Sequence, residues 1–112
     1  MDAGELVVVS CAAPREKFFG VLVALTAVGA TLRVVPLEAF EDWLRQVASD
    51  GTPMIGPVTL FLPTHRLERI EVDESAGAVE GYADRFRRVA HREPREELLR
   101  GSLPRDPATT RM

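Results

Sequence analysis

Cysteine and histidine are nearly missing from this chain of 112 residues, which contains one cysteine, Cys11, and two histidines, His65 and His91. A single cysteine excludes a disulfide framework within the chain and any zinc site built from several cysteines. Few metal ligands remain, so we expect no metal site and no cofactor. The lone thiol also fits a reducing compartment, and we therefore expect a cytoplasmic protein.

Long apolar runs are missing as well. The apolar segment without a charged residue at residues 18–32 has fifteen residues, fewer than the ~20 that a membrane-spanning helix needs. Arg15 and Lys17 precede it as in a signal peptide, but Glu5 and Glu16 make the region before it acidic. We expect neither a signal peptide nor a membrane partner.

An excess of positive charge is also absent, because the formal net charge is −3. Residues 1–83 hold six basic and twelve acidic side chains, whereas residues 84–112 hold eight basic and five acidic ones. A negative body with a mildly positive C-terminal part has no general affinity for phosphate backbones. The contents of 46% hydrophobic and 28% charged residues are instead ordinary for one soluble globular domain.

The first part of the chain predicts three strands. Residues 5–11 are rich in β-branched side chains and end before a proline. Residues 18–25 are apolar at both parities, which predicts a strand covered on both sides. Gly20 inside it predicts a sharp bend or a close backbone approach. A turn at residues 26–29 leads into a third strand at residues 30–35 and makes a hairpin.

The hydrophobic period changes from two to about 3.6 after Pro36, so residues 37–49 are predicted to form an amphipathic helix. Acidic residues occupy its early turns, where the helix dipole favours them. We expect the apolar face to cover the sheet rather than to bind a partner. That face comprises Leu37, Phe40, Trp43, Leu44, Val47 and Ala48.

Two further strands are predicted at residues 58–62 and 66–72, joined by a tight connection at residues 63–65. Three apolar side chains of the second strand are expected to face inward: Leu67, Ile70 and Val72. The first two differ in parity, and a bulge within the strand would reconcile them.

The last third of the chain predicts helices. Residues 73–75 offer capping side chains, and apolar residues then recur at steps of three and four, which predicts a helix over residues 76–91. Pro94 favours the first position of a further short helix. We expect one small domain over residues 1–101 and a frayed tail over residues 102–112.

Cys11 and His65 are a formally possible pair for nucleophilic catalysis. No helix N-terminus or third group that would activate the thiol is recognisable. The sequence also lacks a phosphate-binding glycine loop, a dinucleotide fingerprint, a serine-centred elbow and a metalloprotease helix. We expect a structural thiol and no enzyme, with a small-ligand binder or an enzyme that uses Cys11 and His65 as an alternative.

Two charged clusters have an ordinary and a functional interpretation. The acidic cluster could bind a divalent cation, but it is typical of a solvated strand face that protects an edge. The arginine cluster could contact phosphate, but neighbouring acids favour ion pairs on a helix surface, and no aromatic residue is interleaved to stack on bases. The acidic residues are Glu68, Glu71, Asp73 and Glu74, and the arginines are Arg85, Arg87, Arg88, Arg92 and Arg95.

Gly20-Val21-Leu22 lies in the bent second strand, and residues 62–67 make the short turn between the fourth and fifth strands. A bent strand, a hairpin return, a separated strand and a very short turn are the layout of small SH3-like barrels. Over residues 18–35 and 58–72 the chain resembles an Sm-like domain, whose first motif opens with Gly-x-Leu and whose second motif makes this turn. The resemblance implies ring formation by identical subunits and association with RNA.

Other positions match this family only in part. His65 agrees with one residue of the Lys-His pair in the bacterial branch, whereas Thr64 stands in the place of the lysine. Thr26 and Ala30 stand where the family has an Asp and an Asn that contact nucleotide or brace the loop. A strand-like start in place of the usual N-terminal helix and an inserted helix are further departures.

The sequence therefore predicts a mainly β fold with α-helices. The expected architecture is an SH3-like or Sm-like barrel of five bent antiparallel strands, with an inserted helix at residues 37–49 and a C-terminal helix at residues 76–91. The alternative is an open sheet with both helices on one face.

For function, we expect a non-enzymatic assembly or adaptor module that forms a homo-oligomer through strand edges and apolar helix faces, since such a short chain has more apolar surface than one barrel covers. The alternative is a single-stranded RNA or DNA binder that uses Thr26, His65, Arg66 and Arg69 around the barrel turns. His65 follows Pro63 and is expected at a turn tip, where a ring would gather copies of His65 and Arg66. A solvated turn histidine is the plainer interpretation.

Overall fold

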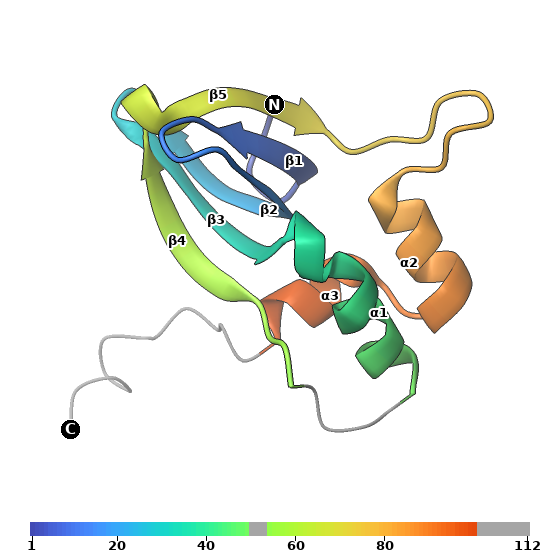
Figure 1. The fold of residues 1–112 in the computed structure, drawn as a ribbon. Helices are drawn as coiled ribbons and strands as arrows, with labels where there is room; N and C mark the ends of the chain where they lie inside the picture. The colour runs from blue at the N-terminus through green and yellow to red at the C-terminus, as the bar shows by residue number, and fades with distance from the viewer. Residues whose placement is uncertain (50–53, 101–112) are drawn as a thin grey trace.

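A computed structural model describes residues 1–49 and 54–100 of the chain (Figure 1). Strands and helices follow one another in this order: β1 (Leu6–Cys11), β2 (Glu16–Thr26), β3 (Gly29–Pro36), the 3₁₀ turn η1 (Leu37–Ala39), α1 (Phe40–Ala48), β4 (Val58–Pro63), the 3₁₀ turn η2 (Thr64–Arg66), β5 (Leu67–Val72), α2 (Tyr82–Ala90) and α3 (Pro94–Leu99). The predicted tail at residues 102–112 lies outside the described residues, and the division into a domain and a tail stays a prediction.

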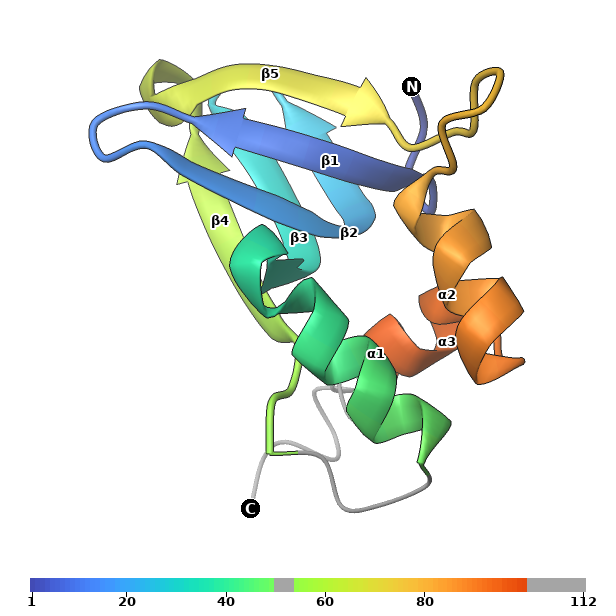
Figure 2. The same cartoon turned by 45° about the vertical axis from the view of Figure 1, so that its right-hand side comes forward.

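All five strands form one antiparallel sheet in the order β4-β3-β2-β1-β5, with β2 at its centre. The sheet is strongly coiled, and β4 and β5 come together only at η2 (Figure 2). Within the described part of the chain no ladder joins these two edge strands, so the sheet is open. The five-stranded antiparallel sheet predicted from the sequence is confirmed, whereas pairing of its edges into a closed barrel is not present.

Both faces of β2 are buried over residues 18–22, each against a different group of side chains. Val23 and Leu25 are exposed, so the predicted cover on both sides of residues 18–25 is present only in the first part. Phe19 and Val21 of β2 point toward the helices, whereas Phe18 and Leu22 point into the curl of the sheet. The outer cluster contains Phe19 and Val21 together with apolar side chains from α1, α2 and α3. The inner cluster contains Phe18 and Leu22 together with apolar side chains from β1, β3 and β4. The three helices therefore cover one face of the sheet (Figures 1 and 2), as the open-sheet alternative predicts.

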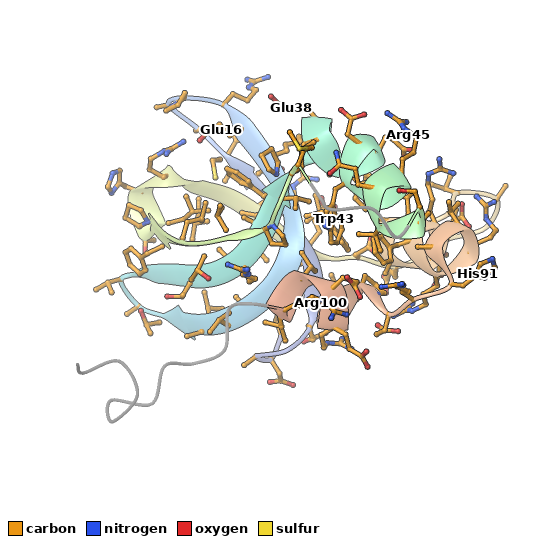
Figure 3. The ribbon with its side chains drawn as sticks, turned by 90° about the horizontal axis from the view of Figure 1, so that it is seen from below. Glu16, Glu38, Trp43, Arg45, His91 and Arg100 are labelled. Carbon is orange, nitrogen blue, oxygen red and sulfur yellow. The ribbon has the colours of Figure 1, made fainter. Side chains whose placement is uncertain are left out.

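Helix α1 confirms the predicted amphipathic helix, although its first turn is the 3₁₀ turn η1. Phe40 packs edge-on against Phe19 of the sheet, with ring centroids 5.4 Å apart. Trp43 lies between α1 and the other helices (Figure 3), 4.7 Å from the ring of Phe86 in α2. The apolar face of α1 is thus a cover for the sheet, as expected.

The helix predicted over residues 76–91 is wrong in its first part, because α2 begins only at Tyr82. Gly77 adopts a left-handed conformation with φ of 60°, which takes this segment out of the helix. Asp73 does cap the helix, but across a loop: its carboxylate accepts hydrogen bonds from the N–H groups of Tyr82 (2.9 Å) and Ala83 (2.8 Å). Helix α3 begins at Pro94, as predicted.

The predicted bulge in the last strand is present. Ser10 pairs with Arg69 whereas Cys11 pairs with Leu67, so Glu68 is the extra residue of β5. Leu67 and Ile70 can therefore both pack against the inner cluster. Val72 stands opposite Val7 and so lies on the inner face as predicted, but it is 38% exposed because it is at the open end of an edge strand.

No helix within the described residues is long and apolar enough to cross a membrane.

Gly20 confirms the close backbone approach that the sequence predicted. It pairs with Val34 in β3 and with Val7 in β1. A Cβ atom at this position would lie 2.1 Å from the carbonyl oxygen of Arg33 and 2.7 Å from Cα of Val34. Both obstacles are backbone atoms of a neighbouring strand, so only glycine fits without moving that strand.

We expect Gly20→Ala to lower the free energy of unfolding by about 2 kcal/mol or more, because β3 must move to admit the methyl group. Urea denaturation of the full chain measures this change. Gly56→Ala is the matched control, since nothing lies within 4 Å of its Cβ position, and we expect a change within ~0.5 kcal/mol. Equal stability of the two variants would contradict the close approach.

Candidate functional site

Three connections meet at one end of the sheet, which we call the turn end: the β1–β2 loop at residues 12–15, the β2–β3 turn at residues 26–29 and η2 (Figure 1). Thr64 of η2 fixes the second of these. Its backbone N–H donates to the carbonyl of Val28 (3.0 Å), and its hydroxyl donates to the carbonyl of Ala27 (3.0 Å). The turn end is therefore held by hydrogen bonds between connections that are far apart in the sequence.

Arg66 fixes the other side of η2. Its guanidinium donates to the carbonyls of Ala12 (3.0 Å) and Pro14 (2.8 Å) and pairs with Glu16 at 3.0 Å. Only 22% of its side chain is exposed. These bonds hold the β1–β2 loop, and they leave little of this arginine free for a ligand.

The other predicted site residues are placed differently. The hydroxyl of Thr26 accepts from the N–H of Val28 and donates to the carbonyl of Gly29, both at 3.2 Å, so it closes its own turn. His65 is exposed on η2, as expected for a turn tip, and its ring makes no hydrogen bond within the described residues. The structure thus brings Thr26, His65 and Arg66 to the turn end.

Arg69 lies apart from these three, on β5. It stands opposite Ser10 of β1, and its ion pair with Glu71 is long, at 3.5 Å, between exposed groups. Arg69 therefore belongs to a face of the sheet and not to the turn end.

Cys11 is fully buried in the inner cluster of the sheet. Burial raises the pKa of its thiol, and the nearby charge of Arg66 offsets only part of this shift. A thiol with a raised pKa is a poor nucleophile at neutral pH. This placement supports the structural interpretation of the cysteine over catalysis with His65.

Two members of the acidic cluster have partners of different kinds. Asp73 caps α2 and Glu71 pairs with Arg69. No group of three or more potential ligands that could hold a metal ion occurs in the described residues. The interpretation as a charged strand face fits this arrangement.

The arginine cluster forms the predicted ion pairs on the helix surface. Arg85 makes a bidentate pair with Glu41 of α1, at 2.8 and 2.6 Å, and this hydrogen bonding lowers the pKa of Glu41. The pair joins α1 to α2. The partners of the remaining members are Asp84 and Glu93 for Arg87, Glu80 for Arg88, Glu97 for Arg92 and Glu93 for Arg95.

The outer edge of β4 is a feature that the sequence analysis did not single out. This strand carries no charged residue, and its side chains Val58 and Phe61 are 48% and 51% exposed. Leu25 and Val28 of the neighbouring β2–β3 hairpin are also exposed. The open edge is thus bordered by apolar surface.

A cleft of about 210 Å³ on the face of β2, β1 and β5 is a second such feature. Its lining residues are Ser10, Arg15, Lys17, Glu68 and Arg69. The sequence gives little indication of this cleft, because its lining residues come together only through the register of three strands.

Comparisons with protein-family models, with curated proteins and with solved structures each found no match to this chain. The Sm-like resemblance therefore stays a prediction from its motif residues.

We expect Arg66→Lys to loosen the β1–β2 loop, because an ammonium group cannot reproduce the geometry of a guanidinium that bonds two carbonyls and a carboxylate. Amide hydrogen exchange of residues 12–16 should become faster, and the free energy of unfolding should fall by about 1–3 kcal/mol. Arg69→Lys is the control, since its exposed ion pair contributes little. Unchanged exchange in Arg66→Lys would show that the loop is held by other contacts.

We expect the thiol of Cys11 to react with a disulfide reagent such as dithionitrobenzoate only when the chain unfolds, because it is buried and its pKa is raised. The rate of labelling in buffer, compared with the rate in concentrated urea, measures this protection. Rapid reaction of the folded chain would restore the catalytic alternative.

Proposed function

We propose that this chain is a non-enzymatic assembly module that forms a homo-oligomer through the open edges of its sheet. An unpaired strand edge presents a row of N–H and C=O groups that can bind another strand. Proteins usually block such edges with charged side chains. The observation that carries the proposal is the uncharged edge of β4, bordered by the exposed side chains of Val58 and Phe61.

The opposite edge, β5, differs in this respect. It carries Glu68, Arg69 and Glu71, which discourage pairing of two copies of β5 with each other. The edge of β4 is free to pair with another strand, whereas two copies of β5 do not pair readily with each other. Together these properties favour a head-to-tail contact between β4 of one subunit and β5 of its neighbour. A head-to-tail contact that closes generates a ring.

The Sm-like or SH3-like assignment belongs to the same proposal. The order β4-β3-β2-β1-β5 puts β4 and β5 at the two edges, and the single turn η2 connects them. Ring formation by identical subunits is what the Sm-like resemblance implies. A cytoplasmic location, expected from the single thiol, remains part of this proposal.

Apolar helix faces contribute less than we expected from the sequence. Phe40, Trp43 and Phe86 are almost fully buried against one another and against the sheet. We therefore assign assembly to the strand edges alone. Nucleic-acid binding around the turns has less support, because Thr26 and Arg66 are engaged in hydrogen bonds within the chain.

We expect the full chain to form oligomers whose mass increases with concentration, and Phe61→Lys to shift them toward the mass of one chain. A lysine on this edge adds charge where a neighbouring strand would pack. Size-exclusion chromatography with light scattering measures the mass, and thermal unfolding verifies that the variant is folded.

Val79→Lys is the matched control, because it replaces another exposed apolar residue, 72% exposed in the loop before α2, by the same charge. It should leave the oligomer unchanged. A wild-type chain that is monomeric at all concentrations, or equal dissociation of the two variants, would refute assembly through the β4 edge.

A further inference from the structure

The cleft on the outer face of the sheet is built by a row of residues across three strands. Ser10 of β1 stands opposite Lys17 of β2 on one side and opposite Arg69 of β5 on the other. Side chains that are directly opposite on adjacent strands project from the same face. The side chains of Lys17, Ser10 and Arg69 therefore lie next to one another, and Arg15 and Glu68 complete the lining.

This part of the face is not covered by the helices. β1 runs away from α2 toward the turn end, so its last residues lie beyond the helical layer (Figure 2). Glu16, next in the chain to Arg15 and Lys17, lies at the opposite side of the molecule from His91 at the end of α2 (Figure 3). The cleft is accordingly open to a ligand in the single chain.

Two cations of the cleft have no partner among the described residues, which distinguishes them from the other described cations. The sequence has fourteen lysine and arginine residues, of which Arg105 and Arg111 lie outside the described residues. Apart from Arg15 and Lys17, each of the others makes an ion pair or a hydrogen bond with described residues. The two side chains without a partner line the same cleft.

Ser10 provides a second, independent observation. Only 8% of the residue is exposed, and it is the buried polar residue of the described core. Its hydroxyl makes no hydrogen bond with another described residue, and no fully buried side-chain oxygen or nitrogen of the described residues lacks a partner, so the Ser10 oxygen is accessible to solvent. It lines the cleft between Lys17 and Arg69, where a ligand oxygen can accept its proton.

We propose that this cleft binds one phosphate-type oxyanion, either inorganic phosphate or the phosphate of a small monoester. Arg15, Lys17 and Arg69 supply the positive charge, and the hydroxyl of Ser10 donates a hydrogen bond from the floor of the cleft. Glu68 is the one acidic group of the lining. Its carboxylate can only accept hydrogen bonds, so it selects an anion that still carries a proton, such as hydrogen phosphate or the monoanion of a phosphate monoester, over sulfate.

A small anion fits this site better than a polymeric one. The neighbouring cleft, which shares Lys17, is lined by the acidic residues Glu71, Asp73 and Glu74. A nucleic-acid strand leaving the phosphate position would run over these carboxylates. No aromatic residue lines the anion cleft to stack on a base.

The test is calorimetric titration of the full chain with inorganic phosphate at pH 7 and low ionic strength, with methyl phosphate and sulfate titrated in parallel. We expect phosphate to bind more tightly than sulfate. Comparison with methyl phosphate shows which of the two sources of phosphate the site prefers. We expect Lys17→Ala to weaken phosphate binding about tenfold or more, because it removes a charge-assisted hydrogen bond.

Two further variants make the result specific. Ser10→Ala removes the hydroxyl without changing the charge and should weaken binding at least about threefold. Arg45→Ala removes an exposed cation of α1 that pairs with Asp42, and it should change the affinity less than twofold. Phe61→Lys should retain phosphate binding, because no lining residue lies on β4, so that failure of the assembly proposal and failure of this one are distinguishable.

Absence of binding at tens of millimolar phosphate would overturn the proposal. It would also be overturned by an equal loss in Lys17→Ala and Arg45→Ala, which would reveal a general charge effect. Tighter binding of a single-stranded oligonucleotide than of phosphate, abolished by Lys17→Ala, would replace the small anion by nucleic acid.

Discussion

Burial of both faces of β2 is the constraint on which the rest of this structure depends. This strand lies at the centre of the sheet, and side chains of both parities between residues 18 and 22 are buried. One short chain covers them in two different ways. The sheet curls over one face, which requires the close approach of β3 at Gly20, and three helices pack on the other. Because these covers use most of the apolar side chains, the surfaces left for function are the strand edges and the ends of the faces.

Arginine holds these parts together to an unusual extent, and it does so through backbone carbonyls. Arg33 donates to the carbonyl of Leu98 (2.7 Å) and Arg95 to that of Gly4 (2.6 Å), which fastens α3 to the sheet and to the N-terminal residues. Arg66 does the same for the β1–β2 loop. A guanidinium has five donors in a fixed plane and can serve several acceptors at once. The only lysine of the sequence, Lys17, makes no such hydrogen bond within the described residues and lines the open cleft.

Local patterns predicted local features well. The change of period after Pro36 indicated α1, glycine within an apolar strand indicated the contact at Gly20, and the conflicting parities of Leu67 and Ile70 indicated the bulge in β5. Features that depend on distant pairing were not predictable in this way. The prediction from apolar spacing placed the start of α2 too early, because the residue that caps this helix, Asp73, is separated from it by a loop. The cleft could not be predicted for the same reason, because only the pairing of β1 with β2 and β5 brings Ser10 next to Lys17 and Arg69.

The pairing of β1 with β5 has a consequence for how the chain is made on the ribosome. β1, β2 and β3 are adjacent in sequence and can pair as soon as they emerge, but β5 follows only after α1 and β4. At translation rates of about 5–20 residues per second, the outer edge of β1 waits some seconds for its partner. That edge carries Val7, Val8 and Val9, which are prone to pair with other nascent chains. A chaperone that protects the edge of β1 would therefore act on this protein before β5 is synthesised, because β5 covers that edge afterwards.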